Sequence, residues 1–305
     1  GCKQVQGNVV VQADADLGSI ESINGTLHVD YGAQTLVAPS LQTVLSITAA
    51  AVSALNLPLL RQTCSVDIVG SLSGGVSIPM LEPGMVMSLL RIQADGSGGP
   101  TGLIDVGSIG GGPLAVDEFS LGGAYSNHIG SFIGMHRTSR FGKAGLRVTI
   151  QYFGFALNAS SLHNITLGSG AGLSVGYWSV PQVLQFSSQG SLGQVFISSS
   201  VDGFLVLNDV TSIAGVDISG PVAVDCPLLE AVGYLQLSAN SRLPGPWLLP
   251  RLGATPMDGL SISSTAPYPV VVDLGSIGGG PTAITGGGIG FGFIFSFSIE
   301  THVKG

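Results

Sequence analysis

Apolar residues recur along this 305-residue chain as short triplets, with an apolar residue on either side of a variable one. This alternation predicts β-strands that bury one face and turn the middle side chain outward. Most successive triplets are about 18–25 residues apart, the length of one coil of a solenoid. The triplets are Val9–Val11, Leu27–Val29, Leu45–Ile47, Val66–Ile68, Leu90–Ile92, Ile104–Val106, Leu173–Val175, Val195–Ile197, Val216–Ile218, Leu235–Leu237, Leu260–Ile262 and Val272–Leu274.

A second pattern follows several triplets, with an apolar residue, a proline, any residue and then a leucine. It occurs in the segments 36–44, 55–63, 224–232 and 248–255. Proline favours a turn, so we expect a coil corner at each of these segments, with the leucine pointing inward. No long segment has helical periodicity, and Gly and Ser interrupt the chain about every ten residues.

The chain also contains a long internal repeat. Residues 103–113 have the sequence LIDVGSIGGGP, and residues 271–281 have VVDLGSIGGGP. The similarity extends upstream, where LNLPLLRQT (55–63) aligns with VDCPLLEAV (224–232). We therefore expect two duplicated solenoid halves, 1–157 and 158–305, each with a terminal β-strand segment. The repeated Asp105 and Asp273 are expected to be turn residues, and the triple glycines to allow a tight reversal with positive φ.

The beginning of the chain resembles a known family. Cys2, Val5, Gly7 and the strand Val9–Val11, followed by Ile23–Val29, are similar to the start of receptor L-domains. These are leucine-rich, right-handed β-solenoid modules of growth-factor receptor ectodomains, and they also occur in fungal GPI-anchored cell-wall proteins. The resemblance implies an all-β, tandem right-handed β-solenoid. The chain departs from the family pattern in two ways. It lacks the paired cysteines of receptor L-domains, and its GSIGGGP ending does not belong to that pattern.

Composition excludes some classes of partner. Charged residues make up 9 % of the chain, against about 25 % in ordinary soluble domains. The mean hydropathy is +0.50, yet no stretch of about 18 uninterrupted apolar residues predicts a transmembrane segment. Only 10 Lys and Arg residues accompany a net charge of −8, so we expect no nucleic-acid partner. A chain with this many apolar residues must bury apolar surface, and we expect part of that surface to be buried between molecules.

Cysteines and sequons point to an extracellular location. An odd number of cysteines, Cys2, Cys64 and Cys226, leaves at least one free or paired between chains. They are either small buried apolar residues or, for Cys2, part of a disulfide. Three N-glycosylation sequons begin at Asn24, Asn158 and Asn164. We interpret the chain, which does not begin with methionine, as a mature secreted protein carrying N-linked glycans.

The C-terminal segment is rich in aromatic residues at alternate positions. Phe291, Phe293, Phe295 and Phe297 would fall on one side of a single strand. Such a strand either caps the solenoid or adds to a neighbouring subunit through its main chain. Neither end of the chain has the polar, charged cap that keeps solenoids soluble, so we expect head-to-tail association.

Catalytic patterns are weak. The five histidines show no zinc-ligand spacing, and the glycine runs lack the Lys-Ser/Thr of a phosphate loop. Asp14 and Asp16 are the carboxylate pair that an enzyme acting on polysaccharides would use. The densest basic stretch contains His128, His136, Arg137, Arg140 and Lys143. This stretch is either a binding site for an acidic glycan or a neighbouring subunit, or a solvated loop.

These observations favour a structural function without enzyme activity, cofactor or metal. We expect a secreted subunit that self-assembles into an extracellular filament, surface appendage, wall or matrix layer. The alternative is a cell-surface binding module of adhesin or receptor L-domain type that recognises a glycan or protein.

Overall fold

The computed structural model describes residues 2–95, 101–123, 129, 131–135, 137–153, 165–178, 182–239, 243–253, 255–264, 271–281, 287–291 and 296–298. These residues form an all-β parallel β-solenoid of about 11 turns and contain no helix. The expectation of an all-β solenoid is therefore confirmed. Two compact units divide the chain: unit 1 holds residues 1–142 and 148–162, and unit 2 holds residues 143–147 and 163–305.

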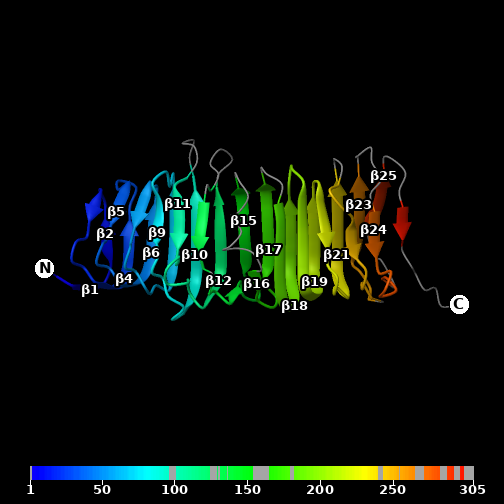
Figure 1. Cartoon of the computed structure of the whole chain (residues 1–305), viewed down its shortest axis with the longest axis horizontal. Coiled ribbons are helices and arrows are strands. Elements are labelled where there is room, and N and C mark those ends of the chain that lie inside the picture. Colours follow the sequence, from blue (N-terminus) through cyan, green and yellow to red (C-terminus); the bar gives the residue numbers. More distant parts are fainter. Residues whose placement is uncertain are drawn as a thin grey trace. The chain divides into compact units, whose positions relative to one another are not determined.

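In unit 1 the chain alternates between two parallel sheets, and successive coils follow one another in sequence order (Figure 1). We call the sheets face A and face B. Face A contains β1 (Gln4–Gln6), β2 (Val9–Val11), β4 (Ser22–Val29), β6 (Thr43–Ala50), β8 (Ser65–Gly70), β10 (Val86–Ala94), β12 (Ala115–Gly123), β14 (Arg140–Phe141) and β15 (Arg147–Phe153). Face B contains β3 (Ala15–Asp16), β5 (Thr35–Val37), β7 (Ala54–Asn56), β9 (Gly75–Ile78), β11 (Leu103–Val106) and β13 (Ser131–Gly134). Most coils contribute one strand to each sheet, whereas β1 and β2 of the first coil both pair with β4, and β14 and β15 both pair with β12.

Unit 2 also consists of parallel strands, but two of them are unusually long. β18 (Gln182–Ser198) and β19 (Gly203–Ser219) each have 17 residues and pair with each other along nearly their whole length. β20 pairs with the first part of β19 and β21 with its last part, so these strands belong to two ladders. The other strands are β16 (Ile165–Leu167), β17 (Gly172–Trp178), β20 (Val222–Asp225), β21 (Ala231–Ala239), β22 (Trp247–Leu249), β23 (Gly259–Ser264), β24 (Val271–Leu274), β25 (Gly287–Phe291) and β26 (Ser296–Ser298).

The predicted triplets form the strands, and most bury both outer residues. In the second coil Leu27 and Val29 are fully buried while His28 is exposed. Stacking of such rungs from coil to coil produces a continuous apolar interior, as the alternation predicts. The prediction is wrong in part at three triplets. Leu45 is 52 % exposed, whereas the middle residues Asp105 and Ser174 are buried.

The proline corners are confirmed as tight turns. In each, the N–H of the corner leucine donates to the carbonyl oxygen three residues earlier, and the leucine side chain is fully buried. The hydrogen bonds are Leu41 to Ala38 at 3.3 Å, Leu60 to Leu57 at 3.2 Å, Leu229 to Cys226 at 3.3 Å and Leu252 to Leu249 at 3.2 Å. The corners therefore anchor each coil in the core.

Candidate functional site

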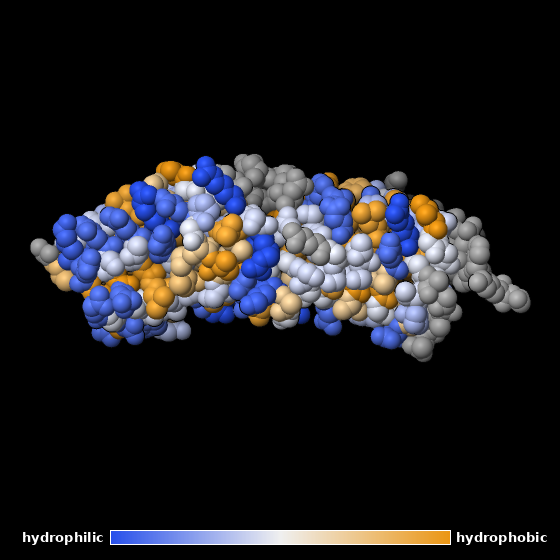
Figure 2. Space-filling view, turned by 90° about the horizontal axis from the view of Figure 1, so that it is seen from below, coloured by the Kyte–Doolittle hydropathy of each residue, from blue (hydrophilic) through white to orange (hydrophobic). Residues whose placement is uncertain are grey.

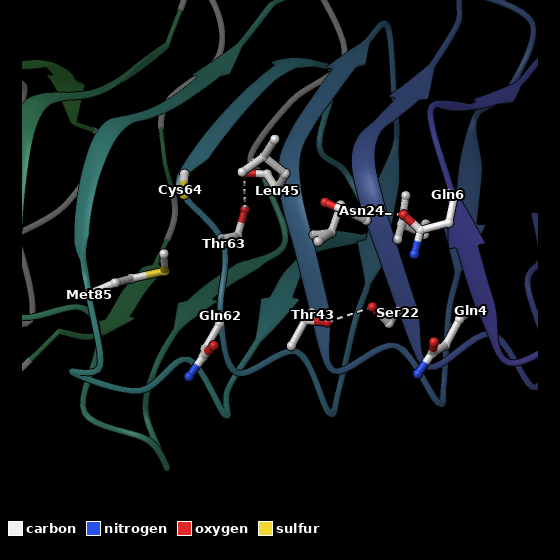
Figure 3. Close-up of a pocket in the computed structure, with 12 residues that line it drawn as sticks. Gln4, Gln6, Ser22, Asn24, Thr43, Leu45, Gln62, Thr63, Cys64 and Met85 are labelled. Carbon is white, nitrogen blue, oxygen red and sulfur yellow. Dashed lines mark hydrogen bonds between the residues drawn. The ribbon is translucent and has the colours of Figure 1, made fainter.

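A polar groove of about 350 Å³ lies on unit 1, across its first four coils. Figure 3 shows its side chains in two rows that run across the strands, with one member of each row from each coil. The lower row is Gln4, Ser22, Thr43 and Gln62, and the upper row is Gln6, Asn24, Leu45 and Cys64. Ile23, Val44, Thr63 and Met85 complete the lining.

The groove lies where the strands depart from regular pairing. Ile23 pairs with Val44 but Thr26 pairs with Ser46, so Asn24 and Gly25 stand opposite the single residue Leu45. Such a β-bulge bends the strand and turns a side chain out of register, which explains the exposure of Leu45. Gly25 is required here, because a Cβ atom would lie 2.3 Å from the carbonyl oxygen of Gly7.

Carboxamide and hydroxyl groups dominate the groove. Asn24 Nδ2 donates to Gln6 Oε1 at 2.9 Å, and Thr43 Oγ1 donates to Ser22 Oγ at 3.0 Å. The carboxamides of Gln4 and Gln62 make no hydrogen bond with the described residues and are exposed. Among the described lining residues, Cys64 alone has an ionisable side chain. The sequence patterns did not predict this groove, although polar residues recur at the same point of the first four coils.

The first coil ends unit 1 in an open strand edge. Among the described residues, β1 and β2 pair only with β4, and β3 pairs only with β5. The N–H of Asp30 donates to the carbonyl oxygen of Val11 at 2.8 Å, so Val11 faces β4. Since hydrogen-bonding groups of a strand point alternately to its two sides, the N–H and C=O of Val10 point to the open edge.

Apolar side chains at this edge are incompletely covered. Val5, Val9, Leu17 and Ile20 are half-buried, whereas Ile23, Leu27, Leu36 and Leu41 of the second coil are at most 1 % exposed. Elsewhere on unit 1 and unit 2, hydrophobic residues reach the surface at several separate places between hydrophilic ones, as the face in Figure 2 shows. The first coil therefore combines unpaired backbone groups with half-buried core side chains. The scattered hydrophobic residues elsewhere on the surface are single exposed side chains.

The two GSIGGGP repeats form the same turn. Asp105 Oδ1 and Oδ2 accept from the N–H and hydroxyl of Ser108 at 3.0 and 2.7 Å, and Asp273 binds Ser276 in the same way at 2.9 and 2.6 Å. The N–H groups of Ile109 and Ile277 donate to the carbonyls of Pro79 and Pro250. Both aspartates are thus turn residues, and the positive φ of Gly111 and Gly279, +98° and +89°, confirms the glycine prediction.

The candidate carboxylates Asp14 and Asp16 bind backbone N–H groups, and a further acidic residue, Asp67, pairs with arginine. Asp14 Oδ1 accepts from the N–H groups of Gln34 and Thr35, both at 2.7 Å, and Asp16 Oδ1 accepts from Gly18 at 2.8 Å. Asp67 forms a bidentate pair with Arg91 at 2.7 and 2.5 Å, which raises the pKa of the arginine. Asp14 and Asp16 each bind backbone N–H groups and play a structural role here.

Of the basic stretch, His128 and His136 lie outside the described residues. Arg140 Nη2 donates to Asp117 Oδ1 at 2.7 Å, and its other terminal nitrogen donates to the carbonyl oxygen of Gly142. Arg140 therefore stabilises its own coil. Among the described residues, no three His, Cys, Asp or Glu side chains come together in a way that could hold a metal ion. No helix in the described part of the chain is long and apolar enough to cross a membrane.

The three cysteines are free and differ in environment. Cys2 is exposed, Cys64 is half-buried in the groove wall, and Cys226 is buried in unit 2. Burial raises the pKa of the Cys226 thiol and so disfavours its reactive thiolate. An interchain disulfide stays a prediction for Cys2.

The remaining predicted sites are partly described. Asn24 lies in β4, while Asn158 and Asn164 fall outside the described residues. Phe291 ends β25, which pairs with β23, and Phe297 lies in β26, which pairs with β24. The prediction of a single aromatic strand is therefore wrong, because these two phenylalanines belong to different strands with different partners. Phe293 and Phe295 lie outside the described residues.

Comparison of the chain with protein-family models, with curated proteins and with solved structures finds no significant match in any of the three.

Proposed function

We propose that this protein is a secreted structural subunit that associates head to tail with copies of itself into an extracellular filament or layer. The observation that carries the proposal is the open edge of the first coil. Among the described residues, β1, β2 and β3 are unpaired on one side there, and the apolar side chains of this coil are half-buried. An edge of this kind is a template for another strand.

A second copy of this chain is the partner that fits the edge best. The described strands of neighbouring coils pair in parallel, so a further coil of the same kind would continue the ladder. At the other end of the described residues, β25 and β26 each pair with one strand only. Contact between opposite ends is heterologous, and such contacts run on as filaments unless they close into a ring.

The finer features belong to the same proposal. They are two duplicated, right-handed halves of receptor L-domain type, and N-linked glycans at Asn158 and Asn164. The sequon at Asn24 stays a prediction, and its amide nitrogen donates to Gln6 inside the groove. The duplication is supported by the identical turns at Asp105 and Asp273.

The test is negative-stain imaging with size-exclusion chromatography across a dilution series. We expect fibres with a repeat of one chain length at high concentration. Val10→Pro removes an N–H that points to the open edge, so it should abolish the fibres and leave the monomer folded. Val10→Thr, which keeps the N–H, is the matched control and should still assemble. A monomer at every concentration would refute the proposal.

A further inference from the structure

We propose that the polar groove of unit 1 binds an uncharged, linear carbohydrate whose chain runs across the strands of the first four coils. The groove lies within one chain, so this binding does not depend on association between copies. Its occupant is defined by the chemistry of the lining, by the repeat of that lining from coil to coil, and by the groups left without a partner.

The lining favours a ligand with many hydroxyl groups. A carboxamide offers both a donor and an acceptor, as a hydroxyl does, and such groups can bond either role of a sugar hydroxyl. Four carboxamides, from Gln4, Gln6, Asn24 and Gln62, line the groove together with the hydroxyls of Ser22 and Thr43. No carboxylate, ammonium or guanidinium group of a described residue lines it, so an ionic ligand would find no countercharge among them.

The repeat of the lining favours a polymer. Each of the first four coils places one side chain in each row, and neighbouring strands of a sheet lie about 4.8 Å apart. A chain of hexose rings repeats its hydroxyls at a similar interval, so one ring can face one coil. An extended peptide fits less well, because peptides dock by pairing with a strand edge, and β4 and β6 are already paired on both sides.

Some groups of the groove are ready for a ligand. Gln4 and Gln62 are exposed, and their carboxamides make no hydrogen bond with described residues. The other polar side chains of the two rows are held by hydrogen bonds across coils, Asn24 to Gln6 and Thr43 to Ser22. Leu45, 52 % exposed, offers an apolar surface on which the C–H face of a sugar ring can pack.

The cysteines provide the assay. Cys64 is in the groove, Cys2 is exposed outside it, and Cys226 is buried. Alkylation with iodoacetamide is followed peptide by peptide by mass spectrometry, on protein made in bacteria so that Asn24 carries no glycan. The probes are neutral β-linked and α-linked glucose oligomers, mannose oligomers and, as an acidic control, galacturonate oligomers.

We expect at least one neutral series to slow alkylation of Cys64, more strongly as the oligomer lengthens up to about four rings, while Cys2 stays unchanged and Cys226 unreactive. Gln62→Ala should weaken that protection by about three- to tenfold, the usual effect of losing one neutral hydrogen bond. Gln42→Ala is the matched control, since Gln42 is also exposed but does not line the groove.

Several results would overturn the proposal. They are no protection of Cys64 by any neutral series, equal protection of Cys2, protection by the acidic oligomers alone, or an equal effect of Gln42→Ala. Repeating the measurement in Val10→Pro separates this site from assembly, because Val10 does not line the groove. Protection retained there, with fibres absent, would show that carbohydrate binding needs no filament.

Discussion

Replacing one glycine of the repeated turn tests whether the GSIGGGP motif serves the fold. A Cβ atom at Gly278 would lie 2.2 Å from the carbonyl oxygen of Arg251 and 2.6 Å from that of Leu252. Ordinary contacts begin near 3.4 Å, so the backbone of the preceding corner would have to move by about 1 Å. That corner is anchored by the buried Leu252, so Gly278→Ala should cost about 3 kcal/mol.

The adjacent Gly279 is the matched control. It has a φ of +89°, but a Cβ atom there would meet nothing within 4 Å. Gly279→Ala therefore costs only the strain of a left-handed conformation, about 1–2 kcal/mol, reduced by the smaller entropy of the unfolded alanine chain. We expect the two substitutions to differ by about 2 kcal/mol in favour of Gly279→Ala.

Urea denaturation measures the free energy of unfolding of each variant. Because solenoids can unfold coil by coil, hydrogen exchange at the amides of residues 275–280 then shows whether the loss of stability is local. Gly110→Ala should behave like Gly278→Ala, because its Cβ would lie 2.3 Å from the carbonyl oxygen of Leu81. Equal stability of Gly278→Ala and Gly279→Ala would refute this reasoning.

Two further predictions concern buried groups of unit 2. Trp247 is fully buried, and its Nε1 donates to the carbonyl oxygen of Val222 at 2.7 Å. Trp247→Phe should therefore lower the stability by about 1–3 kcal/mol, because it leaves that oxygen without this donor. Thermal unfolding of Trp247→Phe beside wild type measures the loss, and an unchanged Tm would contradict the prediction. Burial raises the pKa of Asp217 above its ordinary value of 3.8, so the ionised carboxylate destabilises the fold once the pH exceeds both values, and that penalty disappears as the pH falls below 3.8. Asp217→Asn should therefore raise the Tm slightly at neutral pH and leave it unchanged in strong acid, and a Tm gain that is the same at both pH values would exclude the titration as its cause.

Local patterns in the sequence predicted those parts of the fold that local rules decide. Alternation at Leu27, His28 and Val29 predicted a strand with the histidine outward, because side chains of a strand alternate. Proline followed by a leucine predicted the corner at Leu60, and the repeated aspartate predicted the turn at Asp105. Each of these depends on residues within a few positions of one another.

Features that depend on pairing between coils could not be predicted in this way. The exposure of Leu45 follows from a bulge in β4, a different coil, so its own apolar neighbours predicted the wrong orientation. The 17-residue strands β18 and β19 exist because each supports the other along its length. The groove joins side chains from the first four coils and Met85 from the start of the fifth, which no local pattern connects.

The sequence by itself determined that this protein is built of short strands, proline corners and a repeated glycine turn, because steric rules and alternation act within a few residues. Only the tertiary structure decided which rows of side chains lie in register, and hence where the polar groove and the open edge are. Register is a property of two coils at once, and a shift by one residue moves a side chain to the other face.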